Sequence, residues 1–380
     1  MIILCATIIV VFWLAWCNGA NDNFKGVATL YGSASTTYRK ALIWATLATL
    51  AGGLMSVVLA HGLVKTFSGA GLIDAATSDP IMLTTIGAAA AVTIFLATLL
   101  GMPTSTTHAL TGALVGAGLV AGPAGIHWDT LLTKFAQPLL LSPILAVGAT
   151  VIIYPLLHRL RRTMGIGEQT CICLGQEMPR PVTVMSDGTA LLRMADGSTP
   201  LTISIDETTR CVERYAGRHF GMNVQTTVDI VHWVSSGAVC FARAVNDTPK
   251  IAALLLAAGA SGALVAYWKL GLVAAAMALG GLLSTRKVAE TMSKRITDLN
   301  PGQGLTSSLV TAFLVLIASR FGVPVSTTHV SCGSIFGIGM VSGTARWRTI
   351  GQILLTWVTT LPMGALLGAG AFWILSGMQG

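Results

Sequence analysis

A short motif occurs twice in the chain, and this duplication constrains the fold more than any other feature. The motif reads GMPTSTTH at residues 101–108 and GVPVSTTH at residues 322–329, with six of eight positions identical. An Asn-Asp pair precedes each copy, at residues 21–22 and 246–247. The aspartate and the serine of the motif are 83 residues apart in the first instance and 79 in the second. Two motifs in the same order at nearly the same spacing predict that the chain consists of two homologous halves.

The two halves are built mainly from apolar runs. The chain is 53% hydrophobic and only 10% charged, whereas soluble domains usually carry about 25% charged residues. Several runs are long enough to cross a bilayer core of about 30 Å as helices. The first run continues into the first Asn-Asp pair, so we expect a retained membrane helix and no cleaved signal peptide. The sequence therefore predicts an all-α, multi-pass protein of the cell (inner) membrane. The later long runs cover residues 41–60, 81–101, 138–157, 270–283, 305–317 and 353–375.

Both repeated motifs place polar residues inside apolar sequence, where a carboxylate costs roughly 2.5–3.5 kcal/mol on insertion scales. Residues 1–37 exceed the roughly 20 residues that one crossing needs, which predicts a helix broken at Asn21-Asp22. In the longer motif, Pro103 is poorly placed for a continuous helix, and the hydroxyl residues 104–107 open the next apolar run. This pattern predicts a helix N-terminus with free backbone N–H groups at membrane depth. Such a break is tolerated only where the backbone lines a cavity or packs on protein.

The distribution of lysine and arginine predicts the topology. Basic segments should lie on the cytoplasmic side, and they occur at residues 39–40, 158–162, 286–295 and 346–348. Five net crossings in each half satisfy this rule and place both termini outside. An odd number of crossings makes the halves inverted repeats, the architecture of secondary transporters with a substrate site near the midplane. Because a broken, re-entrant helix counts as one span or as two, we expect about 10–12 transmembrane helices.

The two halves occupy residues 1–157 and 228–380, and residues 158–227 form a predicted cytoplasmic insert. Within the insert, three runs of alternating apolar and polar residues are separated by Asp-Gly pairs, which are a strong hairpin signal. These runs are residues 181–185, 190–194 and 201–205. We therefore expect a small, partly β-structured soluble insert that acts as a spacer or a regulatory module.

The seven cysteines divide between the insert and the apolar segments. Cys171, Cys173 and Cys211, together with His219, form a candidate metal site in the insert, although their spacing is not a standard zinc pattern. The others lie in apolar segments, which predicts packing roles: Cys5, Cys17, Cys240 and Cys332. The net charge is +8, but the charges of the insert are mixed, so we predict no nucleic-acid partner.

The residue types shared by both halves are those of an ion site. Hydroxyl groups and helix N-termini bind anions, whereas Asp and Asn oxygens suit a hard cation such as sodium. A carboxylate also accepts a hydrogen bond from an anion that carries a proton. Hydrogen phosphate carries one at neutral pH and sulfate does not, so the site favours phosphate. Lys25 and Lys250 each follow their aspartate by three residues and add positive charge within one helical turn.

These residues resemble those of the inorganic phosphate transporter family. The resemblance rests on Gly-Ala-Asn-Asp at residues 19–22, Val-Asn-Asp at residues 245–247 and the paired Pro-x-Ser-Thr-Thr-His boxes. It covers residues 1–157 and 228–378 and does not include the insert. One departure is that the second motif, which begins at Arg243, lacks Gly-Ala before its Asn-Asp pair.

The resemblance implies a homodimeric secondary carrier in the lipid bilayer that imports inorganic phosphate by symport with sodium or protons, through alternating access. It implies that the coupling cation, a sodium ion or a proton, lies near Asn21, Asp22, Asn246 and Asp247. It implies that phosphate is bound by Asp22, Ser105, Thr106, Thr107, Asp247, Ser326, Thr327 and Thr328. We assign supporting roles to Lys25, Lys250, His108 and His329.

Several alternatives stay open at the level of sequence. A permease of the same fold for sulfate or another oxyanion is one, and an anion channel is another. A membrane enzyme using Asp22 and Asp247 lacks a nucleophile-base set or a zinc triad, so we predict no catalytic residues and no cofactor beyond the coupling ion. Oxygen ligands allow sodium, and a buried aspartate can instead carry a proton. His108 and His329 either relay protons or hydrogen-bond nearby backbone carbonyls.

Overall fold

The computed structural model folds into two compact units. The insert unit is Pro155–Val231, and the helical unit is Met1–Tyr154 with His232–Gly380. The helical unit contains both predicted halves, which do not form separate bodies. The structure describes residues 2–59, 72–73, 79–167, 170–176, 181–184, 190–192, 201–214, 219–257, 263–321, 323 and 325–377.

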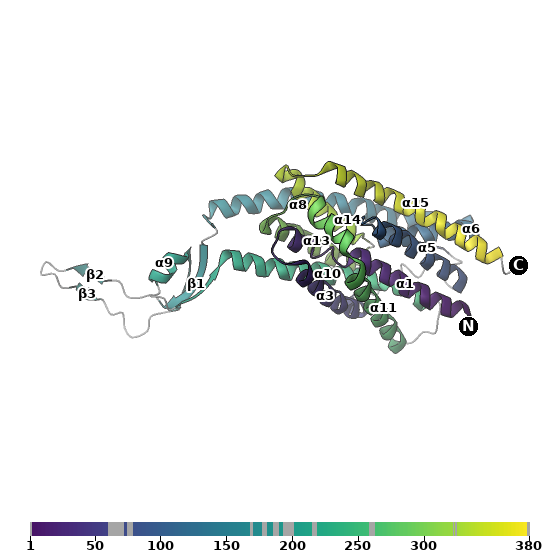
Figure 1. The fold of residues 1–380 in the computed structure, drawn as a ribbon, viewed down its shortest axis with the longest axis horizontal. Helices are drawn as coiled ribbons and strands as arrows, with labels where there is room; N and C mark the ends of the chain where they lie inside the picture. Colours follow the sequence, from purple (N-terminus) through teal and green to yellow (C-terminus); the bar gives the residue numbers. More distant parts are fainter. Residues whose placement is uncertain are drawn as a thin grey trace. The chain divides into compact units, whose positions relative to one another are not determined.

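The first half contributes a helix that is interrupted after the first Asn-Asp pair, followed by several apolar helices (Figure 1). Local sequence sets where some of them begin. Asp79 accepts a hydrogen bond of 2.9 Å from the backbone N–H of Ile81, and Pro80 fills the first helical position, where a missing N–H costs nothing. The elements are α1 (Ile2–Asp22), α2 (Ala28–Gly32), α3 (Tyr38–Leu59), α5 (Pro80–Leu99), α6 (Thr106–Ala121), the 3₁₀ turn η2 (Pro123–Gly125), α7 (Trp128–Thr130), the π-helical η3 (Leu131–Ala136) and α8 (Gln137–Thr163).

The second half is also helical. A capping box opens one of its helices, because Asn300 and Gln303 each accept a 2.9 Å hydrogen bond from the other's backbone N–H. The basic segment at residues 286–295 is helical and bends by 70° from the preceding helix. The elements are α10 (Val224–Ala257), α11 (Ala263–Ser284), α12 (Arg286–Glu290), the π-helical η4 (Thr291–Arg295), α13 (Pro301–Arg320), α14 (Thr327–Ser342) and α15 (Trp347–Gly377).

The backbone around the Asn-Asp pair differs between the halves. In the first half α1 ends at Asp22, as predicted, and the chain turns before α2 begins. In the second half α10 continues without interruption through its Asn-Asp pair, with Pro249 inside it. One reason is local, because Gly26 occupies the turn of the first half and Ile251 stands at the equivalent position of the second. Glycine weakens a helix by about 1 kcal/mol relative to alanine, and isoleucine by less.

Six helices of the described chain are long and apolar enough to cross a membrane, or seven if the bent pair of α11 with α12 and η4 is one span. The helices α6 and α14 are shorter, with 16 residues each. At about 1.5 Å per residue they reach roughly 24 Å, less than the thickness of a bilayer core. Each therefore covers part of the membrane depth, as expected for helices that begin inside it. The total of 10–12 spans stays a prediction.

The helices α6 and α14 pack on the last long helix of the opposite half. Gly112 and Gly116 of α6 face α15, and a Cβ atom at Gly116 would lie 1.9 Å from the carbonyl oxygen of Ala365. Gly333 and Gly337 stand at the equivalent positions of α14 and face α8, where a Cβ atom at Gly337 would lie 2.9 Å from a backbone oxygen. Small residues allow such backbone contact between membrane helices.

The hydrophobic core likewise mixes the two halves. One cluster of buried residues joins Val11, Ile86 and Leu110 of the first half to Leu254 and Val273 of the second. Burial of apolar surface is non-directional and stabilises whichever helices share it. Each half therefore depends on the other for its core.

The cysteines of the helical unit are all free thiols. Cys17, Cys240 and Cys332 are buried, as their predicted packing roles require. Cys5 is exposed on α1, so the same prediction is wrong for that residue, which faces away from the helices around it.

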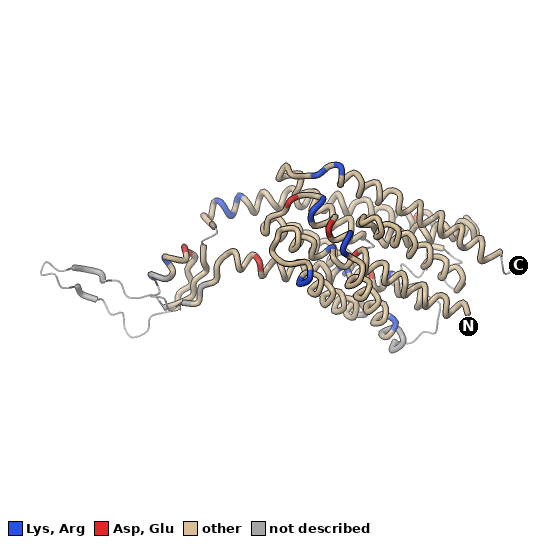
Figure 2. Tube along the Cα trace, in the orientation of Figure 1, with Lys and Arg blue, Asp and Glu red and all other residues tan. Residues whose placement is uncertain are grey.

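The charged residues of the helical unit are unevenly distributed (Figure 2). Lys and Arg of α12, of η4 and at the start of α15 lie toward one end of the unit. The opposite end, where α1 begins and α15 ends, is formed by segments with few charges (Figures 1 and 2). The start of α1 and the end of α15 therefore share one end of the unit, which requires an even total number of crossings, and the odd number expected in each half stays a prediction. The assignment of these ends to membrane sides stays a prediction.

The insert unit contains two small antiparallel sheets. One sheet has the strand order β4-β1-β5 and the other pairs β2 with β3. The helix α9 contacts all three strands of the larger sheet. The elements are β1 (Thr170–Gln176), β2 (Pro181–Val184), β3 (Ala190–Leu192), β4 (Leu201–Glu207), α9 (Thr208–Arg214) and β5 (His219–Asn223).

The first of the two Asp-Gly signals correctly predicts a hairpin, because β2 and β3 pair antiparallel. The second was interpreted in the same way, but β3 does not pair with β4 among the described residues. Instead β4 pairs with β1, and Ile205 lies opposite Ile172. Neither β1 nor β5 was predicted from the sequence, so β4 could not be assigned its correct partner.

Candidate functional site

Five buried charged side chains form one cluster at the point where α1 ends. Asp22, Lys25, Arg243, Asp247 and Lys250 are each at most 2% exposed. We call these five residues the charge cluster. Buried charges are costly unless they are paired. With every group ionised, three cations face two carboxylates, so the cluster carries a net charge of +1 and favours an anion.

Each aspartate of the cluster pairs with the lysine three residues later. Lys25 contacts a carboxylate oxygen of Asp22. In the same way Lys250 Nζ lies 3.2 Å from Asp247 Oδ1. Both pairs are almost completely shielded from solvent. The spacing predicted this contact in both halves.

Two helix N-termini meet beside the cluster. We call Ser105–His108 the first box and Ser326–His329 the second box. In each, the serine caps the helix by accepting a hydrogen bond of 3.2 Å from the backbone N–H of the histidine, as the sequence predicts. The threonine side chains lie in the first helical turn, where backbone N–H groups have no acceptor within the helix. The boxes touch, because the rings of their histidines are 4.5 Å apart.

The lysines connect the two halves through these boxes. Lys25 donates a hydrogen bond to Thr328 of the second box and one of 2.8 Å to the carbonyl oxygen of Thr104. Lys250 donates one of 2.8 Å to Thr107 of the first box and one of 3.1 Å to the carbonyl oxygen of Val325. Thr107 and Thr328 are equivalent residues of the two boxes. Each lysine therefore binds its own half through a carbonyl and the opposite half through a threonine.

The remaining box residues are also buried here. Thr106 donates a hydrogen bond of 3.3 Å to Asp22. Thr327, its equivalent, begins α14 and is 6% exposed. The threonine at the third position of each box also donates to the carbonyl oxygen of the residue that precedes the other box, as in the 2.5 Å bond from Thr328 to Thr104. The structure thus brings the predicted hydroxyl residues of both boxes into one region.

The two asparagines of the Asn-Asp pairs have different environments. Asn21 donates to the Thr98 hydroxyl at 2.9 Å and accepts from the backbone N–H of Thr104 at 3.0 Å. Asn246 donates to the carboxylate of Asp247 at 3.1 Å. Its own carbonyl oxygen is buried and has no hydrogen-bond partner among the described residues. Asn21 therefore holds the first box in place, whereas Asn246 offers a free oxygen ligand.

Asn18 bridges the two aspartates, although it is not among the site residues predicted from the sequence. Its amide nitrogen lies 3.0 Å from Asp22 Oδ2, 2.8 Å from Thr106 Oγ1 and 3.4 Å from Asp247 Oδ2. Its oxygen accepts a 3.1 Å hydrogen bond from Arg243. Asn18 and Arg243 each stand three residues before the asparagine of their Asn-Asp pair. Alignment of the two motifs at that position would have found both.

The histidines of the boxes point to backbone carbonyls. His108 Nδ1 is 3.2 Å from the carbonyl oxygen of Trp357, and His329 Nδ1 is 3.4 Å from that of Leu139. The carbonyls belong to α15 and α8, the helices on which the boxes pack. Of the two alternatives for these residues, the contacts support an anchoring role.

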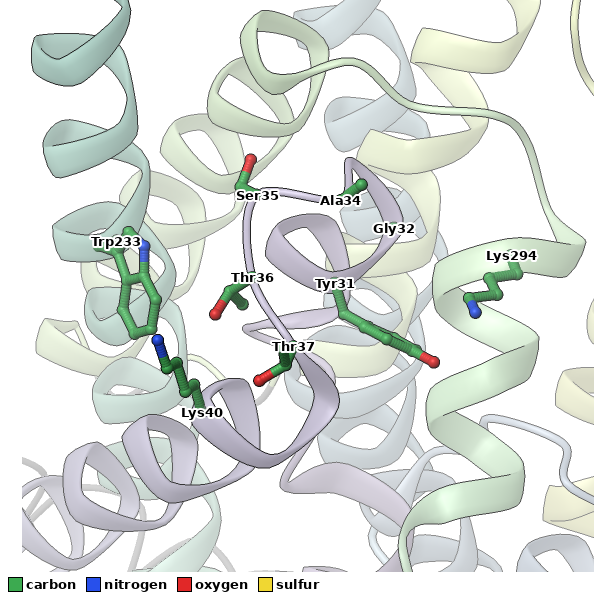
Figure 3. A pocket seen from close by; sticks show the side chains of 9 residues that line it. All are labelled: Tyr31, Gly32, Ala34, Ser35, Thr36, Thr37, Lys40, Trp233 and Lys294. Atoms are coloured by element: carbon green, nitrogen blue, oxygen red, sulfur yellow. The ribbon is translucent and has the colours of Figure 1, made fainter.

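A cavity of about 590 Å³ lies at the connection between α2 and α3 (Figure 3). Figure 3 shows Lys40 near Trp233 on one side and Lys294 beside Tyr31 on another. The Lys294 ammonium lies 4.5 Å from the centre of the Tyr31 ring. That ring packs edge-on against buried Phe24, which precedes Lys25 of the charge cluster. The cavity is lined by Tyr31, Gly32, Ala34, Ser35, Thr36, Thr37, Lys40, Trp233 and Lys294.

Comparisons with known proteins agree on one group. The family model described as the phosphate transporter family matches residues 18–368. A Pyrococcus horikoshii protein named as a phosphate permease is 28% identical over 403 residues, which cover 97% of each chain. The chloroplastic inorganic phosphate transporter 2-1 of Arabidopsis thaliana is 27% identical over 98% of this chain and 72% of its own. A solved structure titled as the sodium-dependent phosphate transporter has the same fold, with a TM-score of 0.75 and 21% identity over 99% of both chains.

Proposed function

The chain belongs to the phosphate transporter family, and from this premise we propose that it imports inorganic phosphate by symport with a cation. The observation that carries the proposal is the meeting of two box helices beside a buried cluster of net charge +1. Helix N-termini and hydroxyl groups bind anions, and lysine ammonium groups strengthen such contacts through charge. No catalytic residue is needed, in keeping with relatives that are named as transporters and permeases.

Phosphate would bind between the two boxes. In this structure Lys25 and Lys250 donate hydrogen bonds to Thr328 and Thr107. A bound anion would need the same N–H donors. We infer that phosphate replaces the threonine hydroxyls as the acceptor of both lysines. The carboxylate of Asp22 or of Asp247 then accepts a hydrogen bond from the protonated oxygen of hydrogen phosphate, a contact that sulfate cannot make. This difference supports phosphate over the alternative oxyanion.

A sodium ion is the coupling cation that the geometry supports best. The buried oxygen of Asn246 lacks a hydrogen-bond partner within the described residues, and Asp247 adds a carboxylate beside it. Oxygen ligands of this kind suit a hard cation. The amide oxygen of Asn21 is already used by the backbone of Thr104. We therefore place the cation in the second half, and a proton stays the alternative that the experiment tests.

Alternating access would use the two halves as moving parts. The threonine contacts made by Lys25 and Lys250 join the halves, and their exchange for phosphate would free the halves to rotate. The cavity of Figure 3 would be the inner mouth, because the basic segment at residues 39–40 predicts the cytoplasmic side there. Phe24 and Tyr31 would close it from the charge cluster. The homodimer and the inverted orientation of the repeats stay predictions.

Uptake of radiolabelled phosphate into proteoliposomes tests the proposal. One set of vesicles carries a sodium gradient and another a proton gradient, each with and without excess sulfate. We expect saturable accumulation driven by the sodium gradient and unaffected by sulfate. Accumulation under the proton gradient alone would show that protons, and not sodium ions, drive uptake. Inhibition by sulfate would show that the site does not discriminate phosphate from sulfate. Phosphate flux that never exceeds equilibrium would indicate a channel.

A further inference from the structure

The insert unit brings three cysteines together on one side of its larger sheet. Cys171 and Cys173 lie on the same face of β1, because alternate residues of a strand point to the same side. Cys211 lies on α9, which contacts this sheet. The three sulfur atoms all lie within 4.8 Å of one another. Strand alternation and one covering helix thus build a thiol cluster that sequence spacing alone does not reveal.

This thiol cluster is also the buried centre of the described part of the insert unit. Cys171 is 3% exposed, and the other two cysteines are fully buried. The opposite face of the sheet remains open, with Ile203 and Phe220 exposed by 74% and 70%. A small unit that buries so little apolar surface needs a crosslink or a metal ion for stability. The thiols occupy the position where either would act.

A disulfide between Cys173 and Cys211 is one such crosslink. It leaves Cys171 as a buried free thiol beside it. A disulfide needs no third thiol, whereas a metal site does. Disulfides also persist mainly in oxidising compartments, and the topology predicted for the chain puts the insert in the reducing cytoplasm. The third thiol is therefore the feature that requires an explanation.

We propose that the reduced thiol cluster of Cys171, Cys173 and Cys211 binds one thiophilic cation of the Zn²⁺ type. A thiol reductant first opens the disulfide, which takes up two electrons and two protons while two reductant thiols become a disulfide. The three thiols then release three protons and form three metal–sulfur bonds. At a Zn–S distance of about 2.3 Å, tetrahedral ligands lie about 3.8 Å apart. That separation falls within the present spread of the sulfur atoms.

The ligand set suits this class of ion. Thiolates prefer Zn²⁺ and Cu⁺ among the biological cations. Three protein ligands leave the fourth tetrahedral position open to water or another side chain. The side chain of His219, the fourth residue of the candidate site in the sequence, lies outside the described part of the structure. Burial raises the pKa of the Cys171 thiol, so this sulfur stays protonated until a cation displaces the proton.

Zinc titration of the full-length protein tests the proposal. The protein is purified without oxygen in a thiol reductant, and Zn²⁺ binding is measured by equilibrium dialysis. We expect one Zn²⁺ per chain. In Cys171→Ser, which retains both cysteines of the disulfide, we expect the dissociation constant to rise at least about tenfold. The control is Cys5→Ser, which removes an exposed thiol of the helical unit and leaves binding unchanged.

A second readout separates ligand loss from misfolding. Co²⁺ in place of Zn²⁺ gives thiolate-to-metal absorption that grows with the number of sulfur ligands, and Cys171→Ser should lower it by about a third. Phosphate uptake by this variant reports whether the chain is folded, since Cys171 is outside the charge cluster. Reduced protein that takes up no zinc, or a disulfide that persists in reductant, would overturn the proposal. So would equal affinity in the Cys171→Ser variant.

Discussion

The two halves of the helical unit make the same contacts on different backbones. In the first half the chain leaves the helix after Asp22 and turns before α2. In the second half Asp247 and Lys250 both lie within the uninterrupted helix α10. Each lysine nevertheless reaches its aspartate, a carbonyl of its own half and a threonine of the other. The comparison teaches that the duplicated element is the set of contacts, and that the backbone conformation is not duplicated with it.

The asymmetry gives the halves separate tasks. The turn of the first half is held closely, because a Cβ atom at Gly26 would lie 2.4 Å from the sulfur of Cys240. Asn23 is fixed in the same turn by Thr46 and Thr49, at 3.0 and 2.7 Å. In the second half the oxygen of Asn246 is left open. The first half of the site is thus held by more hydrogen bonds. The second half offers the carbonyl oxygen of Asn246 as a ligand for a cation.

The largest effect should come from neutralising either aspartate. Asp22→Asn and Asp247→Asn each leave a buried lysine without its partner, which costs about 3–5 kcal/mol. We expect initial rates of phosphate uptake at least about 100-fold lower in both variants. The control is Asp298→Asn. This aspartate is 75% exposed, so its neutralisation leaves no buried charge without a partner. Normal uptake by either variant would show that the halves do not share the substrate equally.

A smaller effect should follow from changes at Asn18 and Arg243, which stand at equivalent positions. Arg243→Met lowers the net charge of the cluster from +1 to zero, so the KM for phosphate should rise about tenfold. Asn18→Ala removes the bridge between the carboxylates but no charge, and its KM should change less. Because the two residues touch, the double variant should be less impaired than the sum of the single changes. The KM values come from uptake at varied phosphate concentration. Additive changes in KM would show that Asn18 and Arg243 act independently.

The two asparagines should differ in sodium dependence. Asn246→Ala removes one oxygen contact, worth about 1 kcal/mol, so half-maximal uptake should need roughly fivefold more sodium. Asn21→Ala removes the bonds to Thr98 and Thr104 and should lower the apparent melting temperature instead. Sodium titrations of uptake and thermal unfolding in detergent give the two readouts. If both variants need the same increase in sodium for half-maximal uptake, the cation would instead lie between the two halves.

The smallest effect should come from Pro249→Ala. Proline in a helix interior is about 3 kcal/mol less favourable than alanine, yet α10 is already helical around it. We expect uptake within about twofold of the original and a slightly higher melting temperature. A large loss of uptake would mean that the second half also bends during transport, and the contrast with the first half would disappear.

Much of this site could be predicted from residue types and spacing. The sequence indicated the lysine–aspartate pairs, because three residues span one turn of helix, and the serine caps, because each serine opens an apolar run. It could not show that Lys25 reaches Thr328, since that contact joins segments 303 residues apart. The sequence also does not show that α10 continues through Pro249, because the tertiary packing of a buried helix outweighs the cost of a proline inside it. The sequence does not show that Asn18 bridges the halves, because its contacts with Asp247 and Arg243 join segments more than 200 residues apart.

In the insert the limits were different. The hairpin of β2 and β3 followed from a turn signal, but the partners of β1 are β4 and β5, which lie farther along the chain than the strand that follows it. The pairing of β1 with β4 and β5 places Cys171 and Cys173 beside Cys211. This arrangement depends on the register between strands that are distant in the sequence. Register of this kind is fixed by the pattern of both partner strands and not by one segment alone.

The glycine contacts of the box helices have a consequence for biosynthesis. The glycines of α6 are made early, but the surface they fit belongs to α15, which is synthesised only after α14. Until then His108 of the first box lacks its carbonyl partner on α15, and a nascent chain stopped before α15 would hold neither a finished site nor a complete packing surface for α6. Chaperones and proteases of the membrane thus meet an incomplete carrier throughout synthesis. Premature termination near the C-terminus should therefore be as damaging to the first box as a lesion within it.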